Sequence, residues 1–536
     1  MNLYVANARE ARDPFLFGRG AAWFAYGMTV ALMILDYVDR QVIVSMFPFL
    51  KTAWNLSDKE LGLLVSVISI TVAVAGIPVA WIADRISRVK SIVVMALLWS
   101  IACIFCMFSQ TYAQLLLART LVGLGEAGYG SVGAAMVAAH FPQRMRAGLL
   151  GGFFASASAG SVLGVILGGV IASRFGWQAA FGVVGIPGLI FALLYLFVRD
   201  YKTVEVSSAT PGEAPTRREL FGSIFCSWTV RWICIGAAAE LITISALWSW
   251  LPSFLNRTYG MAPDKAGVHA ALVVLAGALG SLLLGIVVDR AGLRKADGRF
   301  IGVAILSLLS MVALMFAFGA RHIGIELSQT GQFSAILMGG FLGTCTVGPA
   351  AAIVMDVIHP GVRSTGASVL SLFQNLFGLA VGPFVGGLLS DAIGLTDALA
   401  LMPLASVLAA TSFLMARHGY QTDRRQHGEL VPVNLPIAGA SVPQIAAVTG
   451  HSLKDVEAIL DAHYLGRDVQ LAEAAMLKLE ASGLSPRFIQ QWGRVSVTFE
   501  PIGSVEQRGG ARSPQHSAAS RPVATVDRCD WHIRSV

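Results

Sequence analysis

The sequence predicts an all-α membrane protein in which twelve transmembrane helices form two pseudo-symmetric six-helix bundles, followed by a small, partly helical or disordered C-terminal tail. Three observations predict this fold class. Of 536 residues, 55% are hydrophobic and only 13% are charged, whereas soluble domains carry about a quarter charged residues. Twelve segments are apolar over the roughly 20 residues that a spanning helix needs. An internal repeat relates the two halves of the chain.

The composition also excludes several classes of protein. A mean hydropathy of +0.66 argues against a disordered chain and an ordinary cytosolic enzyme. The six cysteines are scattered, four of them lie inside apolar spans and no metal-type spacing repeats, so neither a disulfide framework nor a metal site is expected. The sequence contains no phosphate-binding loop of the G-x-x-x-x-G-K-[ST] type, which argues against ATP as an energy source. We therefore expect no enzyme activity and no cofactor.

The apolar segments divide the chain in order. Residues 1–20 form a cytoplasmic N-terminal segment, 21–198 the first bundle, 199–229 a polar cytoplasmic linker, 230–416 the second bundle and 417–536 a cytoplasmic tail. The first six spans are expected at 21–49, 60–83, 91–109, 113–139, 147–173 and 178–198. The second six are expected at 230–255, 267–288, 299–320, 331–357, 365–391 and 396–416.

The distribution of basic residues predicts the topology. If both termini are cytoplasmic, the inner loops hold more than twice as many Lys and Arg residues as the outer loops, as the positive-inside rule requires. A net charge of +7 then indicates anionic membrane lipids rather than nucleic acid as the partner surface. We expect a monomeric, multi-pass protein of the cell (inner or plasma) membrane.

The internal repeat supports two related bundles. The loop sequences AWIADRISRVK (80–90) and GIVVDRAGLRK (285–295) follow the second and eighth spans. One interval separates Asp84 from Asp289 and Gly62 from Gly267. A second, slightly longer interval relates the glycine row of the fifth span to that of the eleventh, which places an insertion between the eighth and eleventh spans.

Charged residues inside two spans are candidates for ion coupling. The first span contains Asp36, Asp39 and Arg40, and the fourth contains Arg119 and Glu126 among small residues. Each charge at mid-membrane costs about 2.5–3.5 kcal/mol on insertion scales, so these groups must pair or line an aqueous cavity. A carboxylate in such a pocket beside an arginine can exchange a proton when its access to water changes. Purely structural ion pairs, or charges in the headgroup region, are the alternatives.

Further polar residues in the spans are candidates for a substrate cavity. The set comprises Asp36, Arg119, Tyr129, Glu240, Thr243, Gln374 and Asn375. The alternative is that the polar side chains of the seventh and eleventh spans join helices to one another, as polar residues in membranes often do.

Two further groups are expected to govern packing and gating. Acid–base loops after the second and eighth spans could form a conformational latch; their residues are Asp84, Arg85, Arg88, Asp289, Arg290 and Gly292. Small residues in the fifth and eleventh spans allow close helix packing; they include Gly160, Gly164, Gly168, Gly382, Pro383 and Gly386.

Residues of about 15–416 resemble the major facilitator superfamily. Its signature G-x-x-x-D-R-x-G-R-[KR] is matched after the eighth span by Gly285, Asp289, Arg290 and Gly292. The first copy departs from it, with Ala80 and Ser87 where glycine is usual. GxxxGPxxGG in the eleventh span is similar to the antiporter-type signature of the fifth, where this chain has Val165 in place of the proline.

Within that superfamily the first half resembles the spinster-like transporters. The shared stretches are LDYVDRQ (35–41), LSDKELGLL (56–64), GIPVAWIADR (76–85), LWS (98–100), ARTLVGLGEAG (118–128), FPQRMRA (141–147) and GW (176–177). This resemblance implies that Asp39, Arg40 and Glu126 match a proton-responsive cluster. It also implies a secondary active transporter, with protons and a small organic or amphipathic, lysolipid-like solute as partners. Anion:cation symporters share the charged themes of the first and fourth spans, so organic acids are the alternative solutes.

The tail resembles a different family. Residues 438–480 are similar to the C-terminal end of a phage integrase (tyrosine recombinase), with His451 and Tyr464 at the positions of its late histidine and nucleophile. The arginines that hold the phosphate in that family are missing. We therefore expect an inert or partner-binding remnant, with a membrane-tethered DNA-binding protein as a distant alternative. A non-transporting membrane sensor is the third reading, against which the number of membrane-embedded charges argues.

Overall fold

The computed structural model describes residues 15, 17–200, 227–294, 297–358 and 363–428, and the regular structure of this part is helical. Twelve helical spans in it are long and apolar enough to cross a membrane. Each overlaps one of the spans expected from hydropathy, so the predicted fold class is confirmed. The integrase-like stretch 438–480 and most of the linker lie outside the described residues.

Helices of the first half form six spans, some of them interrupted. They are α1 (Arg19–Val42), η1 (Ile43–Met46), α2 (Phe47–Trp54), α3 (Asp58–Ile86), α4 (Arg88–Met107), α5 (Tyr112–Glu126), α6 (Tyr129–His140), α7 (Gln143–Phe175), α8 (Trp177–Leu194) and η2 (Tyr195–Phe197).

Helices of the second half repeat the plan. They are α10 (Trp228–Tyr259), α11 (Pro263–Arg294), α12 (Gly298–Gly319), η3 (Ala320–Ile323), α13 (Gln329–Gly343), η4 (Thr344–Thr346), α14 (Val347–Val357), α15 (Arg363–Phe373), η6 (Gln374–Leu379), α16 (Val381–Ile393), α17 (Leu395–Leu401), η7 (Met402–Leu404) and α18 (Ala405–Gly428).

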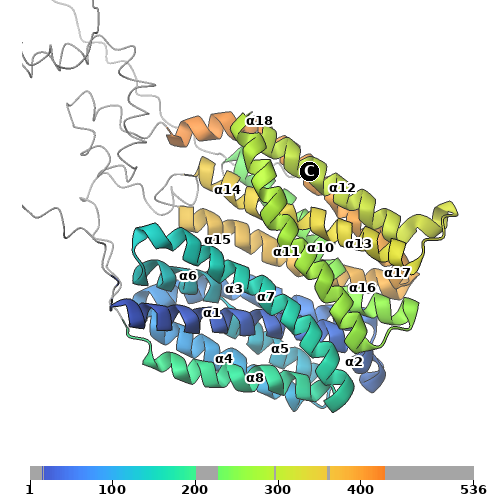
Figure 1. The fold of residues 1–536 in the computed structure, drawn as a ribbon, viewed down its shortest axis with the longest axis horizontal. Helices are drawn as coiled ribbons and strands as arrows, with labels where there is room; N and C mark the ends of the chain where they lie inside the picture. Colours follow the sequence, from blue (N-terminus) through green and yellow to red (C-terminus); the bar gives the residue numbers. More distant parts are fainter. Residues whose placement is uncertain (1–14, 16, 201–226, 295–296, 359–362, 429–536) are drawn as a thin grey trace, which may run out of the picture. The chain divides into compact units, whose positions relative to one another are not determined.

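The same helix pairs are in contact in both halves. In the first, α1 packs on α7, and α4 packs on α5 and α8; in the second, α10 packs on α16, and α12 packs on α13 and α17. Figure 1 shows the two resulting groups of helices, blue to teal and green to orange. They meet along α3 with α16 and along α7 with α11. The helix packing within the two bundles is therefore equivalent, and each bundle contributes one helix to each of the two contacts between them.

Five of the described spans are interrupted along their length; in the twelfth, the 3₁₀-helix η7 separates α17 from α18. The first passes through the 3₁₀-helix η1, the tenth through the 3₁₀-helix η4, and the eleventh through the π-helix η6. The fourth is broken between α5 and α6, where Gly128 has a φ of 82° that side chains disfavour. Interruptions of this kind often mark functional positions, because backbone groups leave the regular helix there.

The glycine rows bring helix backbones together. Along α7, a Cβ added at Gly160, Gly164 or Gly168 would collide with the carbonyl oxygens of Ile34, Val38 and Val42 of the first span. On α16, Gly386 packs against the indole of Trp250, whose Nε1 donates to the carbonyl of Pro383 at 3.0 Å. The geometry agrees with the packing role expected for these glycines.

The last helix extends further than hydropathy suggested. It continues past residue 416 to Gly428, and the carboxylate of Asp423 accepts hydrogen bonds at 2.8 Å from Ser227 Oγ and from the backbone N–H of Thr229. Both donors lie at the start of α10, where a helix has unsatisfied N–H groups. A polar segment therefore stays helical because Asp423 caps the first helix of the second bundle.

Replacing Gly164 with alanine should destabilise the protein. The new Cβ would lie 2.6 Å from the Val38 carbonyl oxygen, and overpacking of this kind costs about 1–3 kcal/mol of unfolding free energy. Thermal unfolding in detergent should show a lower midpoint for Gly164→Ala. The control is Gly151→Ala on the same helix, where no atom lies within 4 Å of the added Cβ; equal midpoints for the two variants would contradict the packing role.

Candidate functional site

A cluster of three charged residues joins the first and fourth spans. Arg40 Nε lies 3.1 Å from Asp36 Oδ1 and 2.9 Å from Glu126 Oε2. The Asp36 and Glu126 side chains are almost completely buried, whereas 17% of the arginine side chain is exposed. The guanidinium also lies 5.3 Å from the ring centre of Tyr37. With both carboxyl groups ionised, this cluster carries a net charge of −1.

A second ion pair lies beside it, fully enclosed. Arg119 Nη1 lies 3.2 Å from Asp39 Oδ2, and both side chains are 0% exposed. The Asp39 carboxylate also accepts from Cys103 Sγ of α4 at 3.0 Å, and the ring of Phe181 of α8 lies 5.9 Å from the guanidinium carbon. Four helices of the first bundle therefore meet at a neutral pair.

The grouping of these charges differs from the expected one. The sequence placed Asp39, Arg40 and Glu126 in one cluster, but the partner of Arg40 on its own helix is Asp36. Residues four apart lie on the same face of a helix, whereas Asp39, one residue before Arg40, is turned by about 100° into the bundle. Asp36 thus joins Arg40 and Glu126, and Asp39 joins Arg119.

Local backbone geometry explains why Glu126 lies at this position. It is the last residue of α5, directly before the break at Gly128. Gly123 packs against the backbone of Ile68 and Gly125 against that of Trp99, with no room for a Cβ at either position. These small neighbours let α3 and α4 lie close to the carboxyl group.

The remaining cavity candidates do not all gather at this cluster. Tyr129 is completely buried in the first bundle, where its hydroxyl donates to the Thr29 carbonyl at 2.7 Å. Gln374 and Asn375 lie on η6, which packs against α10 and, across the interface, against α3; the Asn375 amide donates back to Ser371. Only Asp36 and Arg119 therefore join the charged groups of the first and fourth spans.

Glu240 and Thr243 lie inside the second bundle. Both are buried, and the Thr243 hydroxyl is 3.2 Å from Ser406 Oγ of α18. The Glu240 carboxyl group lies close to Ser307 of α12 and to Ser406. α12 and the last span, which contains α17 and α18, are the counterparts of α4 and α8, so these two side chains face the interior of their own bundle.

The structure describes the ion pairs of the signature loop after the eighth span, whereas the latch expected of the two loops stays a prediction. Asp289 pairs with Arg299 Nε of α12 at 3.2 Å, and the same guanidinium reaches Asp356 at 2.5 Å. Gly292 packs directly against the side chain of Arg299. The described contacts of this acid therefore lie within its own bundle. Arg85 is exposed, Arg88 is half-buried and both have interaction partners, whereas the side chain of Asp84 lies outside the described set.

A cross-bundle cluster was missed by the sequence reasoning. The carboxylate of Asp58, at the start of α3, accepts two hydrogen bonds from the guanidinium of Arg257 of α10, at 2.6 and 2.7 Å. It also pairs with Lys51 Nζ at 2.5 Å and accepts from Ser390 Oγ of α16 at 2.5 Å. Asp391 accepts from the backbone N–H groups of Asp58 and Lys59, each at 2.8 Å. The sequence signal that could have indicated this cluster is an acidic residue, Asp58, at the start of one span and a basic residue, Arg257, at the end of another. This Asp58 cluster ties the two bundles together at one end.

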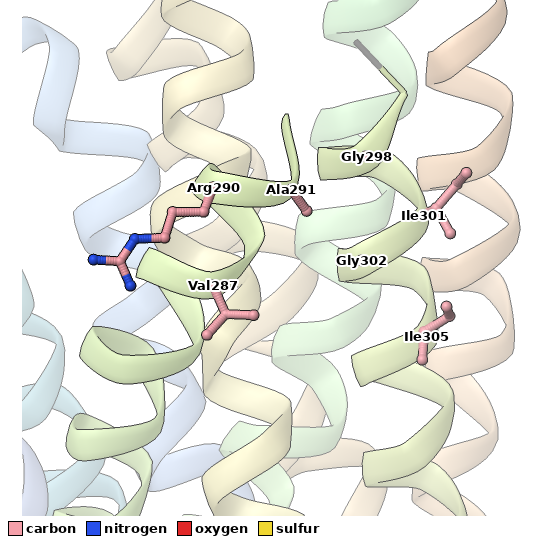
Figure 2. A pocket seen from close by; sticks show the side chains of 7 residues that line it. All are labelled: Val287, Arg290, Ala291, Gly298, Ile301, Gly302 and Ile305. Carbon is pink, nitrogen blue, oxygen red and sulfur yellow. The ribbon is translucent and has the colours of Figure 1, made fainter. Parts of the chain in front are cut away.

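A groove of about 550 Å³ lies between α11 and α12. Its lining residues are Val287, Arg290, Ala291, Gly298, Ile301, Gly302 and Ile305. Figure 2 shows the Arg290 guanidinium pointing away from the α12 residues. The exposed, apolar walls of the groove suit a lipid chain better than a polar solute.

Comparisons with known proteins agree with this architecture. The family description Major Facilitator Superfamily matches residues 29–382 and 233–459 of this chain. An MFS-type efflux pump of Mycolicibacterium smegmatis is 29% identical over 399 residues, 73% of this chain and 89% of that protein. Protein spinster of Drosophila melanogaster is 24% identical over 380 residues, 69% of this chain and 62% of that protein.

A solved structure shares the fold. It is the crystal structure of a bacterial homologue of the human lysosomal transporter Spinster, in an inward-facing and unoccupied conformation. The two superpose with a TM-score of 0.69 at 22% identity, covering 76% of this chain and 99% of that one.

Asp39→Asn should destabilise the fold strongly. It leaves the Arg119 charge buried and unpaired, which costs about 3–5 kcal/mol, so the unfolding midpoint in detergent should fall. The double variant Asp39→Asn/Arg119→Met removes both charges and should recover most of the loss. Asp397→Asn, which breaks an exposed pair with Arg321, is the control and should have little effect. Additive losses in the double variant would rule out the pairing.

Proposed function

This chain belongs to the Major Facilitator Superfamily, and from that membership we propose that it is a proton-coupled secondary transporter working by alternating access. It is a multi-pass membrane transporter of a small-molecule solute, related to spinster proteins. The coupling mechanism, the direction in which the bundles face and the class of solute are our proposals. The observation that carries the coupling is the charge balance of the Asp36–Arg40–Glu126 cluster.

That cluster favours binding of one proton. Two carboxyl groups share one arginine, and Asp36 lies within hydrogen-bonding reach of Glu126. A net charge of −1 buried in a low-dielectric interior is costly, and one proton held between the carboxyl groups makes the cluster neutral. Since Arg40 is partly exposed, water can reach the cluster in this conformation. Proton binding and release can therefore bias the two bundle orientations differently.

The conformation is inward-open if both termini are cytoplasmic, as the positive-inside rule predicts. The Asp58 cluster then lies at the outer end, where it holds the bundles together. The Ser66 hydroxyl of α3 also donates across the interface, to the Ala380 carbonyl at 2.6 Å. Opening toward the outside requires these contacts to break, so the Asp58 cluster acts as the outer gate.

The charges around the first and fourth spans favour a neutral or amphipathic solute. Arg119 is neutralised by Asp39 in a fully buried pair, and Arg40 is shared by two carboxyl groups. Binding of an organic anion would have to displace one of these carboxylates first. An amphipathic, lysolipid-like molecule whose headgroup is uncharged or zwitterionic needs no such exchange, which makes it our preferred solute over an organic anion.

Glu126→Gln should abolish the dependence of transport on a pH gradient while leaving the fold intact. Gln is neutral and similar in shape, so the cluster can no longer exchange its proton. The solute is identified first by thermal stabilisation, because a bound ligand at 100 times its Kd adds about 2.7 kcal/mol. The panel contains lysophospholipids, sphingoid bases, sugar acids, aromatic carboxylates and lipophilic cations. Transport is then measured in proteoliposomes with and without an imposed gradient.

The control is Glu326→Gln, the same change at an exposed loop residue, which should transport like the wild type. Unchanged pH dependence in Glu126→Gln would refute this site as the coupling group. Stabilisation by organic anions alone would instead replace the proposed solute class and make the arginines its binding groups.

Asp58→Asn should shift the protein toward outward-open states. Hydrogen bonds to charged groups contribute about 1.5–3 kcal/mol, and every 1.4 kcal/mol changes an equilibrium constant tenfold. Spin labels at Phe175 and Ile323, exposed residues near the outer ends of different bundles, should show a longer distance in this variant. Asp397→Asn, whose ion pair lies within one bundle, should leave the distance distribution unchanged. An unaltered distribution in Asp58→Asn would exclude the gate.

A further inference from the structure

Glu240 is a buried carboxyl group that the proposed mechanism does not use. It lies near the middle of α10, in a membrane span, and is 0% exposed. Both of its carboxyl oxygens are buried without a hydrogen-bond partner of good geometry. This sets it apart from Asp36, Asp39 and Glu126 of the first bundle, each of which has an arginine partner.

The surroundings of Glu240 are polar but uncharged. Ser307 of α12 and Ser406 of α18 lie beside the carboxyl group, and Cys345 of η4 is the titratable side chain that faces it. Gly343, at the end of α13, packs tightly there: an added Cβ would lie 2.4 Å from Ile244 Cδ1 and 3.2 Å from Glu240 Oε1. Within the described residues no cationic side chain pairs with Glu240.

This environment can hold the neutral acid but not the isolated anion. An ionised carboxylate with no counter-charge is far more costly to bury than a neutral group. The neutral acid has one O–H to donate, and the adjacent serine hydroxyls can accept it or donate in return. The Ser307 hydroxyl has no other hydrogen-bond partner. The surroundings of Glu240 in this conformation therefore favour the protonated acid over the carboxylate.

The helices around Glu240 contain irregular segments that can rearrange. Cys345 belongs to η4, a 3₁₀ turn in the tenth span. Ser406 lies two residues after the end of η7, whose Met402 carbonyl accepts from the Thr243 hydroxyl one turn from Glu240. Mid-span 3₁₀ segments often act as hinges. A shift of either segment would open the enclosure on the side where the carboxyl group lies.

We propose that Glu240 is a second proton-binding site, located in the C-terminal bundle and separate from the Asp36–Arg40–Glu126 cluster. It is protonated in the conformation described. When η4 or η7 moves and water enters, the carboxyl O–H bond breaks, the proton passes to water, and the carboxylate is left hydrated. The site does not depend on the coupling role proposed for Glu126.

The test is infrared difference spectroscopy on the full chain in nanodiscs, with pH raised stepwise from neutral. The wild type should show the C=O stretch of a protonated carboxyl group, shifted in D₂O, that is absent in Glu240→Gln and is lost reversibly as pH rises. A pH-indicator dye should record one proton fewer released per chain in Glu240→Gln than in the wild type. Glu126→Gln should retain the Glu240 band, and the double variant should lose both contributions.

Two results would overturn the proposal. One is the absence of any Glu240-dependent band at neutral pH, which would mean that the group is ionised. The other is a band that persists to the highest pH at which the protein stays folded, which would make Glu240 a permanently neutral structural residue. If Glu240→Gln does not fold, Ser307→Ala/Ser406→Ala serves instead. It keeps the acid, and it must change the pH at which the band disappears; an unchanged pH would refute the site.

Discussion

The requirement that every charge within the membrane be neutralised determines how the helices of this protein are joined. In the first bundle, arginines on two helices hold three carboxyl groups, and the fully enclosed Asp39–Arg119 pair joins the first and fourth spans. Removing one member of such a pair is far more costly than never having built it. The charged residues are therefore a constraint on the fold and, in our proposal, also the groups that respond to protons.

The two bundles meet this requirement in different ways, despite their related helix packing. The first uses ion pairs, whereas the second surrounds Glu240 with hydroxyl groups and supplies no paired cation among the residues described. Between them, the cluster around Asp58 neutralises charges contributed by both bundles. The two bundles therefore share a helix arrangement but surround their buried carboxyl groups differently, and the Asp58 cluster is the charged contact described between them.

Much of this architecture could be predicted from the sequence, because hydropathy and glycine spacing are local signals. The twelve spans and the close helix packing at glycines such as Gly164 belong to this class, whereas the helix on which Gly164 packs was not predicted. Whether Asp36 or Asp39 contacts Arg40 depends on the rotation of the first span about its axis, since successive residues differ by about 100°. The Asp58 cluster depends on how the two bundles are oriented relative to each other. No local sequence pattern predicts either of these two arrangements. The helical continuation to Gly428 was missed because its stabilising contact, at Asp423, comes from residues nearly 200 positions away in the chain.

That contact has a mechanical consequence. Since Asp423 holds the start of α10, the second bundle is closed on itself, with its last helix fastened to its first. The end of α18, from which the chain continues after Gly428, is therefore held to the start of α10. A force applied to the chain after Gly428 would be transmitted through α18 to the start of α10. A truncated chain must therefore keep α18 to preserve the second bundle.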